Sequence, residues 1–383
     1  MFNKISKILF CTVFVLMLTV PLLNTNLKPN VVSEVENRTL APIPQLYDQE
    51  GNKNEAFIAD FESWFNDNIG YREQMFRTNS KMQYHIFNNS PNDKVVIGQD
   101  GWLFYTGENN FKIASGEYPD FDEAVLEQIC QEQIRVQQKL AEQGIEYVII
   151  LPPSKVSIYP EYIRGDFSIR RTPVDELADY LEAHSDIKVV RLKETLLAAK
   201  EGGEGLLYFK TDTHWNAYGS YVGYSKIIED LNTWGVIESA PVEVEFNEYA
   251  SVRDLSLVIG NIEKQYAEYS AVKHIIADAA AISVKEGETY DSIQNYVQET
   301  GIRRGDYYQN SNDDLPVFLL FGDSMILDCM EPLLAENCSE LVCIWHYSVN
   351  QEVIDTVQPD IVFLELSERN LNVLPGAEKN FID

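Results

Sequence analysis

The sequence is poor in positive charge and in cysteine. It has 30 basic against 60 acidic residues and a formal charge of −30 at pH 7. An acidic surface repels phosphate backbones, so we expect no nucleic-acid partner. The five cysteines include no CxxC pair that would indicate a zinc site, and they form no dense disulfide framework. Cys329 and Cys338 are either joined by a disulfide bond in an oxidising compartment or buried as free thiols.

A long run without charge begins near the N-terminus. Lys4 and Lys7 precede it, and it extends from Ile8 to Leu23. The run is slightly short for a membrane-spanning helix and long for a signal-peptide core, and no small-x-small cleavage site follows it. We therefore predict an uncleaved signal anchor over residues 1–25, with the lysines on the cytoplasmic side. A cleaved signal peptide is the alternative, and either one places the rest of the chain outside the membrane.

The 383 residues are enough for one large domain or two ordinary ones. Residues 26–55 are polar, contain proline and asparagine, and indicate a tether that leads away from the membrane. The remainder, residues 56–383, is predicted to be one domain with an N-terminal extension. This extension is predicted to contain amphipathic helices over residues 57–87 and a β-hairpin over residues 95–105. Residues from about 240 to 312 break the later pattern and are predicted to be an insertion.

From about residue 120, helical segments alternate with short, continuous apolar runs. Such runs are typical of strands that are buried on both faces of a parallel sheet. The alternation predicts a three-layer α/β/α sandwich with a mostly parallel sheet and a site at the carboxyl ends of its strands. The five predicted strands lie within residues 146–153, 188–192, 317–324, 341–347 and 361–368.

A serine stands at the end of one predicted strand, in the sequence FLLFGDSM. Ser324 follows Gly322 and Asp323, and a serine between a strand and a helix can present its hydroxyl above the sheet. Gly322 permits a sharp turn and is itself a candidate for binding an oxyanion or the substrate. The backbone N–H groups after it would then also be free to bind an oxyanion. Taken alone, Gly-Asp-Ser is more often a loop or a helix cap.

The sequence YFKTDTHWNAY contains an aspartate and a histidine two residues apart. In an extended segment Asp212 and His214 would point to the same side, so the carboxylate could orient the imidazole towards a nucleophile. A partly buried histidine beside a capping aspartate is the bland alternative. A metal site is disfavoured because no third ligand stands at motif spacing. Of the other four histidines, His346 lies near a predicted strand end and is the rival base.

The motifs together are more specific than any one of them. Asp-x-His-Trp at residues 212–215 and Gly-Asp-Ser at residues 322–324 follow GQDGWLFY at residues 98–105 and LPPSKVSIYPEY at residues 151–162. This ordered set resembles the alginate O-acetylation proteins, which are SGNH-type acyltransferases related to the GDSL hydrolases. It is especially similar to their DHHW relatives in Gram-positive bacteria. The resemblance extends from about residue 35 to the C-terminus.

The resemblance implies that Ser324 is the nucleophile, His214 the base and Asp212 the residue that orients the base. It also implies transfer of an acetyl group to a cell-surface polysaccharide, with a membrane-bound O-acyltransferase as the partner that delivers the acetyl group. This chemistry requires no metal ion and no bound cofactor. Thr213 departs from the DHHW pattern, because it replaces a histidine at a position that we expect to point away from the triad.

Three further residues are candidates for the substrate side of the site. Lys155 follows the first predicted strand and is either near the site or simply exposed. Arg369 follows the last strand and would assist an oxyanion or bind a sugar carboxylate, unless it forms a surface pair with Glu368. Trp215 is a candidate for stacking on a sugar ring, although packing in the core is the usual role of tryptophan.

Two other functions are compatible with the scaffold. A carbohydrate acetyl esterase would use the same triad with water as the acceptor. A non-catalytic polysaccharide-binding or assembly protein would need no triad, and the intact set of Asp212, His214 and Ser324 argues against it. The sequence specifies neither the glycan nor the acetyl donor.

Overall fold

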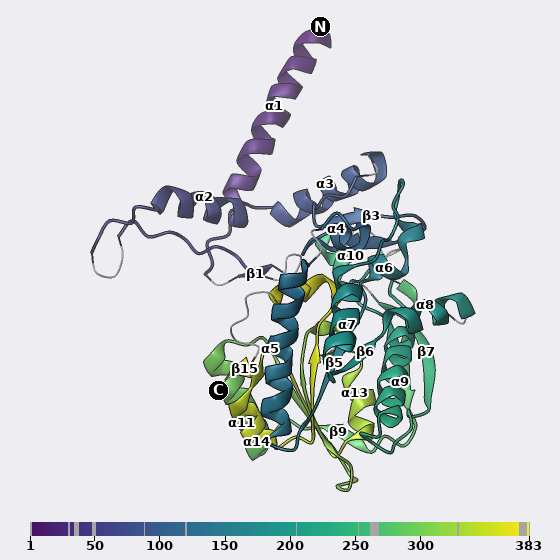
Figure 1. The fold of residues 1–383 in the computed structure, drawn as a ribbon. Coiled ribbons are helices and arrows are strands. Elements are labelled where there is room, and N and C mark those ends of the chain that lie inside the picture. The colour runs from purple at the N-terminus through teal and green to yellow at the C-terminus, as the bar shows by residue number, and fades with distance from the viewer. Residues whose placement is uncertain are drawn as a thin grey trace. The chain divides into compact units, whose positions relative to one another are not determined.

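The computed structural model describes residues 2–29, 31–33, 38–47, 51–87, 89–118, 121–203, 205–251, 253–260, 268–327, 329–374 and 381–382. The chain divides into two compact units, shown together in Figure 1. One consists of Met1–Val95 and Ser256–Tyr266, and the other of Val96–Leu255 and Ala267–Asp383. The predicted domain boundaries at residues 25 and 55 stay predictions.

The first unit is mainly helical. Its first helix, α1 (Phe2–Leu23), contains a 20-residue apolar stretch from Lys4 to Leu23 that is long enough to cross a membrane. A signal sequence near the N-terminus has the same character. The two helices predicted from the aromatic spacing are present as α2 (Phe57–Asn68) and α3 (Arg72–Phe87). A short pair of strands, β1 (Val32–Ser33) and β2 (Arg38–Thr39), lies between α1 and α2 in the sequence.

The second unit is built on a seven-stranded sheet with the order β6-β5-β14-β11-β12-β10-β9. The first five strands in this order are parallel, and β10 and β9 are antiparallel to their neighbours. All five apolar runs that predicted strands form this parallel part, which confirms the mostly parallel sheet. The strands are β5 (Glu146–Leu151), β6 (Lys188–Arg191), β9 (Ala281–Ser283), β10 (Gly305–Asn310), β11 (Val317–Phe321), β12 (Glu340–Ile344) and β14 (Ile361–Glu365).

Helices cover both faces of this sheet, as Figure 1 shows. Along β11 the side chains alternate, so that Phe318 and Leu320 join one buried cluster while Leu319 and Phe321 join the other. Each large apolar side chain buried in this way stabilises the fold by about 1.5–3 kcal/mol. The two clusters confirm the predicted α/β/α sandwich. The helices are α6 (Lys155–Ile158), α8 (Lys193–Gly202), α9 (Ala217–Thr233) and α13 (Glu331–Leu334) on the first side, and α5 (Glu123–Ala141), α7 (Pro173–His184), α11 (Glu288–Thr300) and α14 (Gln351–Val357) on the second.

The predicted hairpin over residues 95–105 is present as β3 (Val95–Ile97) and β4 (Leu103–Tyr105). The segment predicted as an insertion contains the antiparallel pair β7 (Val244–Ser251) and β8 (Glu268–Ile276). The helix α10 (Asp254–Val258) stands between these two strands in the sequence. Later residues of the same segment form β9, α11 and β10, so they extend the edge of the main sheet. The remaining short elements are α4 (Asn110–Ser115), α12 (Ser324–Leu327), β13 (Val349–Asn350), β15 (Phe381–Ile382) and the 3-10 helices Pro160–Tyr162, Ala335–Asn337 and Glu368–Val373.

The cysteines are free thiols. Cys130, Cys338 and Cys343 are buried and Cys329 is partly buried, so the proposed bond between Cys329 and Cys338 is not formed. Burial raises the pKa of the Cys338 thiol. These residues therefore act as small apolar side chains of the core.

Candidate active site

Ser324 lies at the carboxyl end of β11, where the chain turns into α12. The turn passes close to the next strand in the sheet, because a Cβ atom on Gly322 would lie 2.5 Å from Oε2 of Glu365. Gly322 is therefore needed for steric reasons. Its N–H donates to the Ile344 carbonyl at 3.1 Å. Since this donor is already used, Gly322 is not the oxyanion donor that the sequence suggested.

Asp212 and His214 lie in a tight turn and not in the extended segment that we expected. An isolated bridge between Tyr208 and Trp215 closes the turn. Within it, Oδ1 of Asp212 accepts a hydrogen bond from the His214 N–H at 3.0 Å. A short aspartate side chain readily makes this local bond, which competes with extended structure. The turn ends at Asn216, which caps α9 by accepting from the Gly219 N–H.

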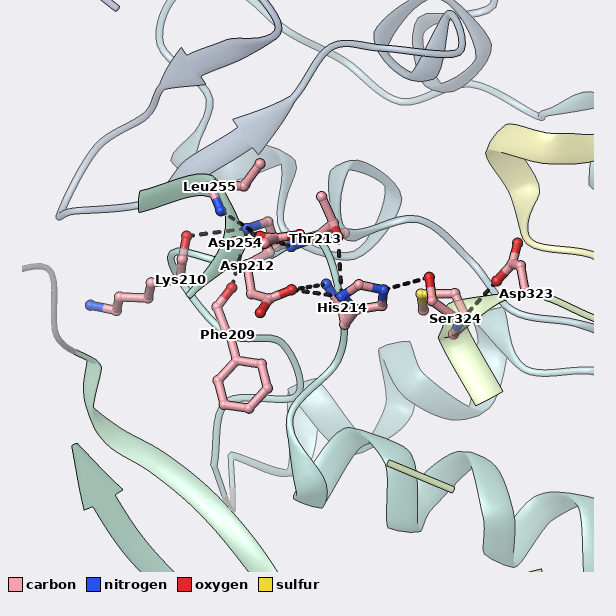
Figure 2. A network of polar contacts seen from close by, with 11 residues as sticks. Phe209, Lys210, Asp212, Thr213, His214, Asp254, Leu255, Asp323 and Ser324 are labelled. Atoms are coloured by element: carbon pink, nitrogen blue, oxygen red, sulfur yellow. Dashed lines mark hydrogen bonds and ion pairs between the residues drawn. The ribbon is translucent and has the colours of Figure 1, made fainter. Parts of the chain in front are cut away.

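The turn and the end of β11 bring three predicted residues into one hydrogen-bonded chain, drawn in Figure 2. Nδ1 of His214 lies 2.7 Å from Oδ1 of Asp212. Nε2 of the same ring lies 2.7 Å from Oγ of Ser324. Both distances are those of good hydrogen bonds, and the order carboxylate, imidazole, hydroxyl is that of a serine-hydrolase triad.

The electrostatics of the pair favour a charged carboxylate and a basic imidazole. Burial alone would raise the pKa of Asp212, but hydrogen bonds from His214 and its charge outweigh burial and lower it. Burial alone would lower the pKa of His214, but the hydrogen bond and the charge of Asp212 outweigh burial and raise it. A histidine with a raised pKa is a stronger base towards the Ser324 hydroxyl.

Lys155 holds the backbone of the turn that contains Asp212 and His214. It is only 3% exposed, and Nζ donates to the carbonyl oxygens of Phe209 and Lys210 at 3.1 Å and of Asp212 at 2.5 Å. Its ammonium also lies over the aromatic rings of Trp102 and Phe104. Lys155 is therefore not an exposed lysine: it lies near the site, and its charge holds the backbone of the turn.

Thr213 and Asp254 form a second arm of the network, which the sequence reasoning missed. The Thr213 hydroxyl lies 3.1 Å from Nδ1 of His214 and donates to Oδ2 of Asp254 at 2.7 Å. The expectation that Thr213 points away from the triad is therefore wrong. Asp254 begins α10, 41 positions after Thr213. No spacing pattern in the sequence connects the two residues.

Asp212, His214 and Asp254 each place one possible metal-ligand atom within 4.8 Å of the others. Two ligands of one tetrahedral zinc ion would stand roughly 3.3 Å apart, given metal–ligand distances of about 2.0–2.2 Å. Nδ1 of His214 and Oδ1 of Asp212 are 2.7 Å apart, which is the separation of atoms that share a proton. The arrangement fits a hydrogen-bond network better than a metal site.

Part of the chain is similar to a known protein family. Residues 95–267 match the family model described as "SGNH hydrolase-like domain, acetyltransferase AlgX". These residues are therefore similar to that family, whose model matches less than half of the chain. The match contains Asp212 and His214 and ends before Ser324.

Two curated relatives match part of the chain. The probable alginate O-acetylase AlgJ of Pseudomonas syringae pv. tomato is 30% identical over 176 residues, which are 44% of this chain and 40% of the relative. The probable alginate O-acetylase AlgJ of Pseudomonas fluorescens is 28% identical over 152 residues, which are 39% of this chain and 36% of the relative. The chain thus spans about 40% of the length of the curated relatives that it matches.

The comparison with solved structures gives one match that shows a shared fold and a second match with a lower score. Bacillus cereus PatB1 superposes with a TM-score of 0.50 and 18% identity, and covers 74% of this chain and 98% of that structure. A DHHW family protein from Eubacterium siraeum superposes with a TM-score of 0.47 and 14% identity over 76% of this chain and 95% of that one. At this identity the likeness to PatB1 establishes the fold alone.

Next to Ser324, the second unit contains a buried polar network centred on Asp323. Oδ2 of Asp323 accepts hydrogen bonds from Ser367 at 2.5 Å and from Asn370 at 2.6 Å. The N–H of Asp323 donates to the fully buried Glu365 at 2.6 Å. Burial raises the pKa of Glu365, and the charge of Asp323 adds to the effect. Asp323 and Glu365 therefore hold the turn that carries Ser324.

The same network decides which N–H groups remain for an oxyanion. The Met325 N–H donates to Oδ1 of Asp323 at 2.8 Å, so it is not free as the sequence suggested. The N–H groups of Gly322 and Asp323 are also used. Of the N–H groups of residues 322–325, that of Ser324 has no acceptor in the part of the chain that the structure describes.

A small pocket adjoins the triad. It is lined by residues next to the catalytic candidates, namely Thr213 and Met325, and by Phe104, Tyr105, Asn110, Pro153, Ser154, Lys155, Val156, Ser367 and Arg369. Its volume of about 10 Å³ holds about one water molecule. Arg369 lies here over the ring of Tyr105, whereas Glu368 is fully buried and accepts from the Ser154 N–H. The alternative of a surface Glu368–Arg369 pair is therefore wrong.

Two other candidates lie away from the reacting atoms. Trp215 is fully buried in the core beside Tyr208, so its ring has no face for a sugar. Nδ1 of His346 accepts from the Ser348 N–H at 3.1 Å. The structure therefore pairs Ser324 with His214 and not with His346.

Proposed function

We propose that the chain is an extracytoplasmic O-acetyltransferase that transfers acetyl groups to polysaccharide hydroxyls through an acyl-serine intermediate. The hydrogen-bonded chain of Asp212, His214 and Ser324 carries this proposal. The inference that the transferred group is acetyl rests on the match to the AlgX-type family model and to relatives named alginate O-acetylases. The apolar helix α1 supports an anchor in the membrane, from which the rest of the chain would work outside the cytoplasm.

The reaction has two halves, each with His214 as the proton carrier. Oγ of Ser324 attacks the carbonyl carbon of the donor while Nε2 of His214 takes the hydroxyl proton. The donor's leaving group departs with that proton, and an acetyl ester remains on Ser324. A sugar hydroxyl then attacks this ester as His214 takes its proton, and the proton returns to Oγ when the ester bond to Ser324 breaks.

The negative oxygen formed in each half requires a donor. The Ser324 N–H points to this role because it has no acceptor among the described residues. Arg369 is the candidate for a second group that contacts the oxyanion, because it lines the pocket together with Ser367 and Met325. A fixed donor in a water-poor site stabilises an oxyanion more than water does.

The acetyl donor belongs to the same proposal. A polytopic membrane-bound O-acyltransferase would deliver the acetyl group across the membrane, and α1 would keep the enzyme beside it. The triad serves an esterase equally well, since water can replace the sugar hydroxyl in the second half. The acceptor therefore distinguishes the two reactions.

The test is a transfer assay with the full chain in detergent. 4-Nitrophenyl acetate supplies the acetyl group, and neutral, amino-sugar and uronate oligosaccharides are offered as acceptors. Acetylated oligosaccharide, detected by mass, supports the transferase. Release of acetate at a rate that no oligosaccharide changes assigns an esterase instead. A folded protein that does neither contradicts both reactions.

A further inference from the structure

The second arm of the network links a carboxylate outside the triad to the base, as Figure 2 shows. We propose that Asp254 is a positioning residue, which acts through Thr213 to hold the His214 ring with its proton on Nδ1. This inference rests on the proposed function, since it assigns a residue that prepares the base for that reaction.

Counting donors and acceptors gives the proton positions. An ionised Asp254 can only accept, so the Thr213 hydroxyl must donate its one proton to Oδ2 at 2.7 Å. The Thr213 oxygen then has only lone pairs to offer Nδ1 of His214 at 3.1 Å. Oδ1 of Asp212 also offers a lone pair to this nitrogen. Nδ1 therefore carries the proton, and the lone pair of Nε2 faces the Ser324 hydroxyl.

Asp254 is itself held firmly against the turn. Its Oδ1 accepts from the Thr213 N–H at 3.1 Å and from the Leu255 N–H at 2.5 Å. The Leu255 N–H also reaches the Thr211 carbonyl at 3.2 Å. On the other side, the guanidinium of Arg253 lies 3.7 Å from the centre of the Phe209 ring. The segment 253–255 thus contacts the turn at three successive residues.

The same carboxylate favours the charged form of the base. Burial and three charged groups act on the pKa of His214. Burial and Arg369 disfavour the charged imidazole, whereas Asp212 and Asp254 favour it. Lys155 faces both carboxylates and favours their charged forms. Burial and the charge of Asp212 raise the pKa of Asp254 itself. When Ser324 gives up its proton, the imidazolium formed has two carboxylates on its Nδ1 side, Asp212 in direct contact and Asp254 beyond the Thr213 hydroxyl.

Three substitutions separate this role from simple support of the fold. Asp254→Asn keeps the size and removes the charge, and its amide can donate to the Thr213 oxygen, which frees the hydroxyl proton to face Nδ1. Thr213→Val keeps the shape and removes the hydroxyl. Thr213→Ser restores the hydroxyl and is the conservative variant. Asp278→Asn, at an exposed turn, is the matched control.

The measurement is NMR of the full chain with 15N-labelled histidine, which reports the pKa and the protonated nitrogen of each of the five histidines. His214→Ala identifies the His214 signal. We expect the His214 pKa to fall in Asp254→Asn, and the Nε2-protonated form to increase in Asp254→Asn and Thr213→Val. Thr213→Ser and Asp278→Asn should resemble the wild type. An unchanged His214 signal in both Asp254→Asn and Thr213→Val overturns the inference.

Kinetics with 4-nitrophenyl acetate give an independent readout. We expect kcat to fall about tenfold in Asp254→Asn and in Thr213→Val with KM little changed, and no further in the double variant, because the two residues act in series. Multiplying losses in the double variant would contradict the series arrangement. A wild type without any activity but with the predicted NMR changes would refute the proposed function and leave Asp254 as a positioning residue.

Discussion

Nε2 of His214 and Oγ of Ser324 lie 2.7 Å apart although 110 positions separate them in the sequence. One residue stands in a turn that Lys155 holds by three carbonyl contacts, and the other stands at the end of a central strand. The contact therefore depends on the sheet and on a buried cation together. The predictions below test each of these supports.

The pH dependence follows from the environment of His214. Burial lowers its pKa, but Asp212 and Asp254 outweigh burial and raise it above the usual value of 6.5. The base works only when unprotonated, so activity should fall as pH decreases through this raised pKa. We predict an acid limb in kcat/KM with a midpoint above pH 6.5, measured with an acetyl ester of pH-independent reactivity. A midpoint at or below 6.5 would contradict the electrostatic account.

Asp212→Asn should remove the charge and keep the shape of the turn, because an amide oxygen can still accept from the His214 N–H. Nδ1 contacts the same oxygen as this N–H, so an amide that instead turns its NH2 group towards Nδ1 gives up the bond to the N–H and leaves Nδ1 without its proton. We expect kcat to fall by about 10³–10⁴-fold, as for triad aspartates generally. The thermal unfolding midpoint should change little. Activity within tenfold of wild type would show that Asp212 does not orient the base.

Lys155→Met should destabilise the protein and disorder the turn. Methionine keeps the packing against Trp102 and Phe104 but leaves three carbonyls without their charged donor. We expect a loss of roughly 2–4 kcal/mol in the free energy of unfolding, measured with urea. Lys226→Met removes a partly exposed i,i+4 pair and is the control, with an expected change of about 0.5 kcal/mol or less. Equal effects of the two substitutions would count against the role of Lys155.

Gly322→Ala should act through sterics alone. The added Cβ would lie 2.5 Å from Oε2 and 2.8 Å from Cβ of Glu365, in a buried region that cannot expand freely. Overpacking of this kind costs about 1–3 kcal/mol. The displaced turn would also move Ser324 away from His214. We therefore expect the folded Gly322→Ala protein to lose activity, beyond any loss that unfolding would cause. A fully active, stable Gly322→Ala protein would mean that the turn tolerates a side chain.

The buried strands were predictable because a parallel strand covered on both faces must be a continuous apolar run. Asp212, His214 and Ser324 could be proposed from the sequence because the chemistry of a serine triad requires these residue types, although only Ser324 lies at the end of a strand. Asp254 could not, since its contact with Thr213 joins segments that share no periodic pattern. The burial of Lys155 was not predictable, because a lysine is buried only where several acceptors converge. The positions of the carbonyl groups that accept from it follow from the fold and not from the local sequence.

The sequence also could not predict which backbone N–H groups around Ser324 are already hydrogen-bonded. The sequence suggested that the turn after Gly322 leaves several of them free, but the side chains of Asp323 and Glu365 occupy two. Those carboxylates are ordinary polar residues in the sequence. Only the folded arrangement shows that they bind the turn and leave the Ser324 N–H for an oxyanion.

The central claim is that Ser324 carries the acetyl group, and intact-protein mass spectrometry tests it most directly. The full chain is mixed with 4-nitrophenyl acetate, quenched in acid within seconds and digested to locate the adduct. The account predicts one acetyl group on the Ser324 peptide of the wild type. It predicts none on that peptide in Ser324→Ala or His214→Ala, with both variants folded by their melting curves. An acetyl adduct on another residue, or an equal adduct in Ser324→Ala, would contradict the account.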